Sequence, residues 1–389
     1  MVIRFALSLI ITLCAISSSF ANLISQVRPA AIDAVEIDKR ASQLMHQLEM
    51  VGMSVALVEN GKIIFAKGYG DKARGTNGTV TADTVFRWAS VSKGVAAATV
   101  LSLEEHGALT LDQPASFHAP SLKLPDTPKK ISIKDLLSHR IGIVRNAYDK
   151  RIEDGRPAQE IRSALHGLSY LCDPGTCHTY QNVAYDAASE MVETVTGLPY
   201  KTVVHHRLFA PLGMTTASLT LEGLVRSKDW ARPHGRNGEV ITRVKPTYYR
   251  VPAAAGVNSS VKDLAKWMIA QMPTSAEGNT VLPKTLTDKM QSPLVTTPRE
   301  QAFLNRGYGD LRGSHYGLGW RVYDYNGHKV VGHRGGVEGY RSLVLFDPER
   351  RAGIAMMWNS PHTRPIGLQM EFMDQLYGLP KRDWLRINS

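Results

Sequence analysis

The 389-residue chain has only three cysteines, and it contains no long hydrophobic run after its first 21 residues. A membrane-spanning helix needs about 20 consecutive apolar residues, so we expect no stable membrane span in the rest of the chain. No Gly-x-Ser-x-Gly sequence occurs, which excludes a lipase-like nucleophile elbow. His-Glu-x-x-His and glycine-rich phosphate loops are also absent. We therefore expect neither a metal ion nor an organic cofactor.

Residues 1–21, MVIRFALSLIITLCAISSSFA, have the pattern of a cleaved secretory signal. Arg4 gives a positive start, an apolar stretch follows, and Ser19-Phe20-Ala21 resembles a cleavage site for small residues. An uncleaved anchor is the alternative. We predict a periplasmic or secreted protein whose single domain spans residues 22–389.

The chain has few acidic residues, and its formal net charge is +11. Cleavage of the signal removes Arg4 and leaves +10, which is still strongly basic. Because an exported protein rarely meets nucleic acid, we expect no nucleic-acid partner. Anionic cell-envelope polymers are the partners that this charge favours, and a solvated basic surface is the alternative.

The two remaining cysteines lie in CDPGTC, residues 172–177. Asp-Pro-Gly is strong turn chemistry, because proline fixes φ and glycine permits a positive φ. An oxidising compartment then favours a bond between Cys172 and Cys177. Two free thiols or a metal site are the alternatives. We predict a disulfide that fixes the following loop, which carries Tyr180 and Asn182.

The two ends of the chain are rich in strand patterns. Segments of about 50–70 and 316–360 alternate apolar runs with turns, and both contain an Asn-Gly pair, at 60–61 and 326–327, that indicates a hairpin. The middle, about 90–310, is mostly helical. We predict an α/β fold of the α+β type, in which one antiparallel sheet is flanked by helices and faces a mostly helical lobe, with the active site between them.

Two further helices are expected at the ends of the sheet. Apolar residues recur with a helical period over 30–50, a pattern that Gly52 ends. A closing helix is predicted near 365–377, where it would cover one face of the sheet. The pair His205-His206 is typical of a helix end rather than of a metal site.

A Ser-x-x-Lys pattern occurs at Ser90 and Lys93, at the start of an alanine-rich helical segment. The amide groups at a helix N-terminus favour developing negative charge. A lysine three residues later lies on the same helix face and can approach the serine hydroxyl. Ser90 is therefore a candidate nucleophile with Lys93 as its base.

The pattern is common by chance, and a second copy runs from Ser259 to Lys262. Here Ser260 and Asp263 have the spacing of a helix capping box. We therefore reject the second copy as a catalytic pair.

Two other segments contain candidate site residues. Tyr180 and Asn182 lie in a loop before a helix, where a tyrosine can transfer protons and an asparagine can bind Lys93 or a substrate amide. His333 and Gly335 share one face of a strand, because side chains alternate along strands. Gly335 would leave room for substrate, and the amide of Gly336 would contribute to an oxyanion hole.

Together these motifs resemble those of the serine β-lactamase-like superfamily, which includes class C β-lactamases, D,D-carboxypeptidases (penicillin-binding proteins) and related esterases. The three motifs of that superfamily stand here in order as SVSK (90–93), YQN (180–182) and HRG (333–335). Connecting segments such as LFAPLGMTTAS and YGLGW agree as well. The resemblance covers about residues 35–378 and implies a β-lactamase/transpeptidase-like fold.

The resemblance implies a serine hydrolase that forms an acyl-enzyme on Ser90. Lys93 and Tyr180 would share the acid–base work, and which of them takes the first proton stays open. Asn182 and the His-x-Gly strand would position a small-molecule or peptide substrate. The amides of Ser90 and Gly336 would form the oxyanion hole.

One departure bears on the substrate. Many true β-lactamases have lysine where this chain has His333, and histidine with its reference pKa of about 6.5 is mostly neutral at pH 7. This form resembles D,D-peptidases, D-aminopeptidases and esterases more closely. Arg341 is a candidate carboxylate-binding group. A carboxylesterase and a non-catalytic envelope-binding or sensor protein stay open as alternatives to D,D-peptidase or β-lactamase activity.

Overall fold

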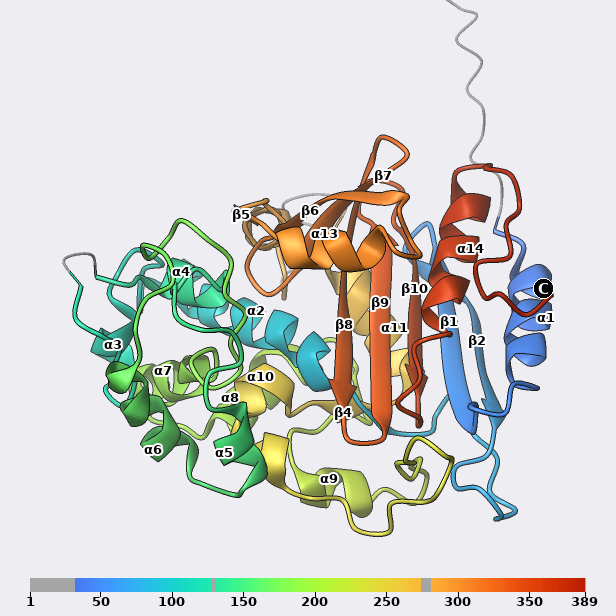
Figure 1. Ribbon diagram of the computed structural model, residues 1–389, viewed down its shortest axis with the longest axis horizontal. Coiled ribbons are helices and arrows are strands. Elements are labelled where there is room, and N and C mark those ends of the chain that lie inside the picture. Colours follow the sequence, from blue (N-terminus) through green and yellow to red (C-terminus); the bar gives the residue numbers. More distant parts are fainter. Residues whose placement is uncertain (1–31, 128–129, 274–280, 389) are drawn as a thin grey trace, which may run out of the picture.

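The computed structural model describes residues 32–127, 130–273 and 281–388. The predicted signal at 1–21 lies outside these residues and stays a prediction. The central feature is an eight-stranded antiparallel sheet in the order β2-β1-β10-β9-β8-β7-β6-β5 (Figure 1). The strands are β1 Gly52–Glu59, β2 Lys62–Gly70, β5 Val295–Thr296, β6 Leu311–Tyr316, β7 Arg321–Tyr325, β8 His328–Val337, β9 Tyr340–Asp347 and β10 Ala352–Trp358, and the short strands β3 Phe86–Arg87 and β4 Asn258–Ser259 pair separately.

Most of the regular secondary structure between β2 and β6 is helical. The α-helices are α1 Ala34–Leu44, α2 Ser92–Glu105, α3 Ala115–His118, α4 Ile133–Leu137, α5 Asp149–Glu153, α6 Ala158–Ser163, α7 Ala187–Thr196, α8 Tyr200–Val204, α9 Leu221–Val225, α10 Pro252–Ala255, α11 Val261–Ala270, α12 Lys284–Met290, α13 Pro298–Leu304 and α14 Ile366–Leu376. Short helical turns η1 Ala89–Val91, η2 Ala164–Gly167, η3 His205–Phe209 and η4 Thr247–Arg250 complete the set; η3 is π-helical and the others are 3₁₀ turns.

The sheet separates two hydrophobic cores. On one face, Val55, Leu57 and their neighbours pack against α1 and α14. On the other face, Ala56, Val344 and Phe346 belong to a larger core that includes α2, α7 and α11. Figure 1 shows α1 and α14 beside one end of the sheet and the helical lobe at the other. The predicted α+β architecture is thus confirmed.

Asn-Gly turns join neighbouring strands where the sequence predicts hairpins. Asn60 and Gly61 have φ values of 50° and 72°, and Asn326 and Gly327 have φ values of 51° and 80°. Asparagine and glycine tolerate this left-handed conformation, which matches the twist of a two-residue hairpin. β1 also pairs with β10, so the two ends of the chain form one sheet.

Several boundaries differ from the predictions. The sheet extends beyond 316–360, because β5 and β6 add two strands on its far edge. α11 lies within the segment assigned to the lobe, yet it packs on β1 and β10. α1 ends at Leu44 rather than continuing toward Gly52, and Val35 is 79% exposed, so part of the apolar pattern faces solvent. Among the helices that the structure describes, none has the length and apolar character to cross a membrane.

Candidate functional site

Ser90 lies in the η1 turn immediately before α2, where the chain passes from β3 to the helical lobe. Its neighbour Ala89 has a φ of 49°, in the left-handed region that non-glycine residues rarely adopt. Ser90 is partly exposed, whereas residues 84–89 and 91–103 are all buried. The tight turn therefore presents a single hydroxyl group from an otherwise buried segment. Backbone strain of this kind concentrates at functional sites.

Gly335 holds this turn against β8. A Cβ atom at Gly335 would lie 2.1 Å from the carbonyl oxygen of Trp88 and 3.1 Å from the Cβ of Ala89. The hydroxyl of Ser342, opposite Gly335 on β9, donates to the same Trp88 oxygen at 2.5 Å. The expectation that Gly335 leaves space for substrate is therefore wrong, because the turn before Ser90 fills that space.

Gly335→Ala is expected to lower the free energy of unfolding by about 1–3 kcal/mol, the usual cost of overpacking, and to displace Ser90. Urea denaturation and any assay of hydrolysis measure the two effects. Gly167→Ala is the matched control, since nothing lies within 4 Å of a Cβ placed at Gly167. A Gly335→Ala protein with the stability and activity of the control would contradict this packing role.

The ammonium group of Lys93 faces three acceptors. Its Nζ lies 3.4 Å from Ser90 Oγ, 2.7 Å from Asn182 Oδ1 and 3.0 Å from the carbonyl oxygen of Ala254. The residue is fully buried. Two strong contacts thus orient the amine toward the one exposed hydroxyl. A lysine held beside a serine in this way is a recurrent means of activating a nucleophile.

Tyr180 covers the other side of Lys93. Lys93 Nζ lies 4.7 Å from the centre of the Tyr180 ring, and the His139 ring lies 4.2 Å from that centre. Tyr180 is 8% exposed. The structure therefore brings Ser90, Lys93, Tyr180 and Asn182 together from two separate segments of the chain.

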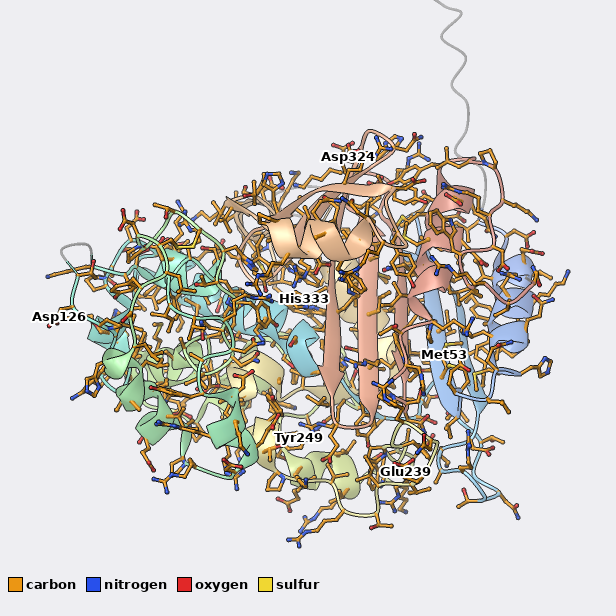
Figure 2. All side chains as sticks on the ribbon, viewed as in Figure 1. Met53, Asp126, Glu239, Tyr249, Asp324 and His333 are labelled. Carbon is orange, nitrogen blue, oxygen red and sulfur yellow. A yellow bond between two sulfur atoms is a disulfide. The ribbon has the colours of Figure 1, made fainter. Side chains whose placement is uncertain are left out.

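His333 lies on the side of β8 that faces the helical lobe (Figure 2). Its Nδ1 lies 2.8 Å from the carbonyl oxygen of Arg334, to which it donates, so Nε2 accepts from the Tyr316 hydroxyl at 3.0 Å. Burial, followed by the positive charges of Arg321 and Lys93, lowers the pKa of His333 well below its usual value. His333 is therefore a neutral imidazole.

Arg341, the arginine expected to bind a substrate carboxylate, does not face Ser90, whereas Arg321 lies near Tyr180. Arg341 donates to the carbonyl oxygen of Pro361, and its guanidinium covers Gly336 on the sheet face opposite Gly335. It therefore lies away from Ser90 and is not a carboxylate-binding group there. Arg321 lies 5.9 Å from the centre of the Tyr180 ring and 3.3 Å from Glu300, which also binds Arg334. Arg321 belongs to no motif, so the sequence alone did not identify it.

His139 is a second residue that motif analysis missed. It is buried with a φ of 58°, and its Nδ1 accepts from the backbone N–H of Gln181 at 3.2 Å. Its carbonyl oxygen accepts from the N–H of Thr179 at 2.7 Å. Burial lowers the pKa of His139 well below its usual value. The neutral His139 residue thus anchors the backbone on both sides of Tyr180 and packs against the Tyr180 ring.

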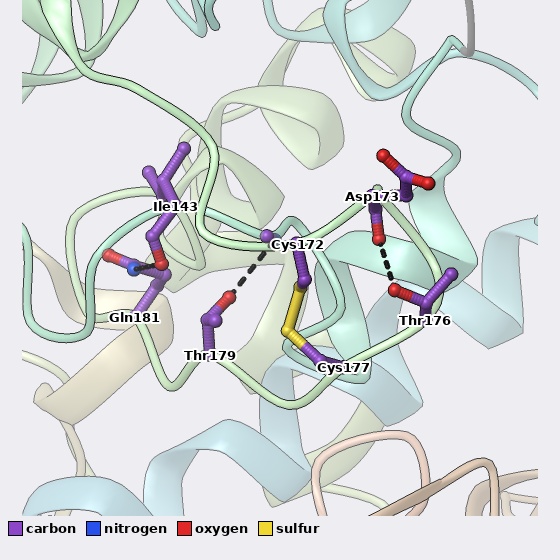
Figure 3. Close-up of a disulfide and its surroundings, with 8 residues drawn as sticks. Ile143, Cys172, Asp173, Thr176, Cys177, Thr179 and Gln181 are labelled. Carbon is purple, nitrogen blue, oxygen red and sulfur yellow. Dashed lines mark hydrogen bonds between the residues drawn. A yellow bond between two sulfur atoms is a disulfide. The ribbon is translucent and has the colours of Figure 1, made fainter.

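Cys172 and Cys177 form the predicted disulfide, which Figure 3 shows beside the Tyr180 segment. This segment also has anchors of its own. Thr179 Oγ1 accepts from the N–H of Gly142 at 3.0 Å, and the carbonyl oxygen of Tyr180 accepts from the N–H of Asn146 at 2.8 Å. The disulfide is therefore one of several links that hold the loop.

Replacing both cysteines by serine is expected to lower the free energy of unfolding by about 2 kcal/mol, since the bond closes a short loop. Activity is expected to fall only several-fold, because the hydrogen bonds at Thr179 and Tyr180 persist. Urea denaturation and an activity assay test this pair of effects. Unchanged stability together with unchanged activity would refute any role for the bond.

The motifs set aside in the sequence lie outside this arrangement. Ser259 is buried and accepts from Trp88 Nε1 at 2.8 Å, and Lys262 pairs with Asp83 at 2.7 Å on the surface. Ser260 caps α11, although Thr216 rather than Asp263 accepts from its N–H. Within residues 32–127, 130–273 and 281–388, no cluster of three histidine, cysteine or acidic side chains has the geometry to hold a metal ion.

The chain is similar to known proteins over most of its length. The chain is 29% identical over 358 residues to unguisins hydrolase ungD' of Aspergillus campestris, which covers 86% of this chain and 62% of that protein. It is 25% identical over 330 residues to protein flp of Staphylococcus aureus, covering 83% of this chain and 62% of that protein. The chain thus spans less than two thirds of the length of these relatives.

The fold has a close counterpart among solved structures. The octameric penicillin-binding protein homologue from Pyrococcus abyssi superposes with a TM-score of 0.79 at 24% identity, over 90% of this chain and 78% of that one. The Beta-lactamase family model matches residues 37–372, which include SVSK, YQN and HRG. The chain therefore belongs to the beta-lactamase family, whose fold carries serine hydrolases.

Proposed function

We propose that this protein is an exported serine hydrolase that forms an acyl-enzyme on Ser90. The observation that carries the proposal is the contact of 3.4 Å between Lys93 Nζ and the hydroxyl of Ser90, the one partly exposed residue in an otherwise buried segment. Membership of the beta-lactamase family supports it. A basic chain with a predicted N-terminal signal and a disulfide fits an oxidising compartment outside the cytoplasm.

In the proposed reaction, Ser90 Oγ attacks the carbonyl carbon of the substrate. Its proton passes to the deprotonated member of the pair Lys93 and Tyr180, the phenolate or the neutral amine, and the pair later protonates the leaving group. The amides of Ser90 and Gly336 stabilise the tetrahedral oxyanion. Water then attacks the ester, the same pair takes its proton, and Ser90 regains its hydrogen. Asn182 and His333 position the substrate.

The substrate class favoured by the motifs is an amide of the D,D-peptide or β-lactam type. Relatives named as unguisins hydrolases support hydrolytic activity in this branch of the family. The neutral state of His333 favours a second candidate, a carboxylesterase, because an ester needs no cation beside His333 to bind a carboxylate. A non-catalytic envelope-binding or sensor protein would not require Lys93 and Tyr180 beside Ser90.

Incubation with benzylpenicillin, followed by intact-protein mass spectrometry and measurement of drug loss, separates these candidates. A persistent adduct on Ser90 indicates a D,D-peptidase-like site with slow deacylation, and rapid drug loss without adduct indicates a β-lactamase. If neither occurs, hydrolysis of a p-nitrophenyl ester by the wild type and not by Ser90→Ala identifies the esterase. Inertness toward all of these substrates would overturn the amide and ester assignments.

A further inference from the structure

We propose that Asp149 is a positioning residue that fixes the amide of Asn182, and through it Lys93, for the reaction at Ser90. The inference rests on the proposed function, since it assigns a role within the same site. Asn182 Nδ2 donates to Asp149 Oδ2 at 2.7 Å, and Asn182 Oδ1 accepts from Lys93 Nζ at 2.7 Å. Ser90, Lys93, Asn182 and Asp149 thus form one continuous chain of hydrogen bonds.

Asp149 determines the direction of this chain. An ionised carboxylate only accepts hydrogen bonds, and an ammonium only donates them. The amide of Asn182 can satisfy both neighbours in one orientation alone, with its nitrogen toward Asp149 and its oxygen toward Lys93. Without the carboxylate, the amide can rotate and present its NH₂ group to the ammonium. Lys93 would then lose its shortest acceptor.

The turn that positions Asp149 has a strained backbone. Asn146 and Tyr148 both adopt left-handed conformations, with φ values of 52° and 59°, in the turn that leads to α5. The N–H of Ala147 donates to Gln181 Oε1 at 3.2 Å, which ties the turn to the YQN segment. Strained non-glycine residues persist where the surrounding structure requires a particular placement. Here the placed group is the carboxylate beside Asn182.

The surroundings of Asp149 point to a role other than stability. Its Oδ1 atom is buried and has no hydrogen-bond partner. Burial and the nearby charge of Glu153 raise the pKa of Asp149, whereas Asn182 and Lys93 lower it, and Tyr248 faces it from η4. A buried carboxylate in which one of the two oxygens accepts no hydrogen bond is unfavourable unless a nearby positive charge compensates for the cost of burial. The positive charge of Lys93, across the amide, is that partner.

Asp149 has no hydrogen bond to Ser90, and the probe chosen here has no amide for Asn182 to bind, so loss of Asp149 should slow the chemical step and leave binding of the probe unchanged. The probe is an alkyl fluorophosphonate, which forms a covalent bond with an activated serine and releases fluoride. Intact-protein mass spectrometry gives the maximal rate of Ser90 labelling, kinact, and the half-saturating concentration, KI. Asp149→Asn is expected to lower kinact by about tenfold or more while KI stays within about twofold.

A double-mutant cycle distinguishes positioning from a general structural effect. Because Asp149 acts through Asn182, Asp149→Asn should add nothing in an Asn182→Ala background, whereas independent defects would multiply. Asp154→Asn is the matched control, since Asp154 lies just beyond α5, is exposed and pairs only with Lys150. In the Asp154→Asn variant, Ser90 should be labelled with the kinact and KI of the wild type. Asp149→Ser replaces Asp149→Asn if the latter fails to fold.

The outcomes are distinct. Wild-type labelling kinetics in Asp149→Asn, or a penalty of equal size in both backgrounds, overturns the role of Asp149 and leaves the proposed function intact. Absence of labelling at Ser90 in the wild type overturns the proposed function and the role of Asp149 together. A loss of kinact that disappears in the Asn182→Ala background supports the inference.

Discussion

Ser90→Ala is expected to reduce hydrolysis by at least about a thousandfold, because removal of a nucleophile leaves only the weak catalysis provided by binding and oxyanion stabilisation. The melting temperature should stay close to that of the wild type. Among the residues that the structure describes, Ser90 Oγ has one hydrogen bond, which it accepts from Lys93 Nζ at 3.4 Å, so its loss leaves little unsatisfied. Steady-state kinetics and a thermal melt measure the two quantities.

Ser259→Ala is the natural control for this experiment. Ser259 belongs to the second Ser-x-x-Lys sequence, but its hydroxyl only accepts from Trp88 Nε1 and donates to the carbonyl oxygen of Ser260. Activity should be nearly intact. If Ser259→Ala lost as much activity as Ser90→Ala, the assignment of Ser90 as the nucleophile would be wrong. Substrate turnover by Ser90→Ala would refute the mechanism.

Mild acid is expected to destabilise the protein strongly. His139, His178 and His333 all have a lowered pKa, in each case chiefly because of burial, and that of His178 is about 3. As the pH falls below about 6.5, the unfolded chain binds protons that the folded protein excludes. His178, whose pKa is about 3, alone removes roughly 2 kcal/mol of stability between pH 7 and pH 5. His139 and His333 act in the same direction, whereas Asp186, whose pKa burial raises to about 7, acts in the opposite direction.

Urea denaturation at several pH values tests this dependence. His178→Gln should make the loss of stability between pH 6.5 and pH 5 smaller by about 1.4 kcal/mol per pH unit, since the proton that His178 excludes in the folded state no longer contributes. His166→Gln, at an exposed histidine, should leave the slope unchanged. A stability that does not change across this range would show that these histidines are not held neutral by the fold.

The parts of the fold that local sequence determines were predictable. Asn60-Gly61 and Asn326-Gly327 favour left-handed turns wherever they occur, so two hairpins followed directly from the sequence. The alanine-rich helix after Ser90 was similarly evident. β5, a strand of two residues, has no pattern of its own and exists because β6 offers a free edge.

The candidate site was predictable only where a motif marked it. Ser90, Lys93, Tyr180 and Asn182 were named from sequence, and the structure places them together. Gly335 was named for the wrong reason, since its proximity to Trp88 depends on tertiary packing. Arg321, His139 and Asp149 act through neighbours that are distant in the chain. The sequence around a histidine or an aspartate in a loop does not show whether its side chain contacts a distant site residue or is simply exposed to solvent.

The central claim is that Ser90 is the acylated residue, and peptide mapping after fluorophosphonate treatment tests it most directly. The account predicts one adduct per chain, on the peptide that contains SVSK, and no adduct in Ser90→Ala. An adduct on Ser259 or elsewhere, or hydrolysis that persists when Ser90 is fully modified, would contradict it.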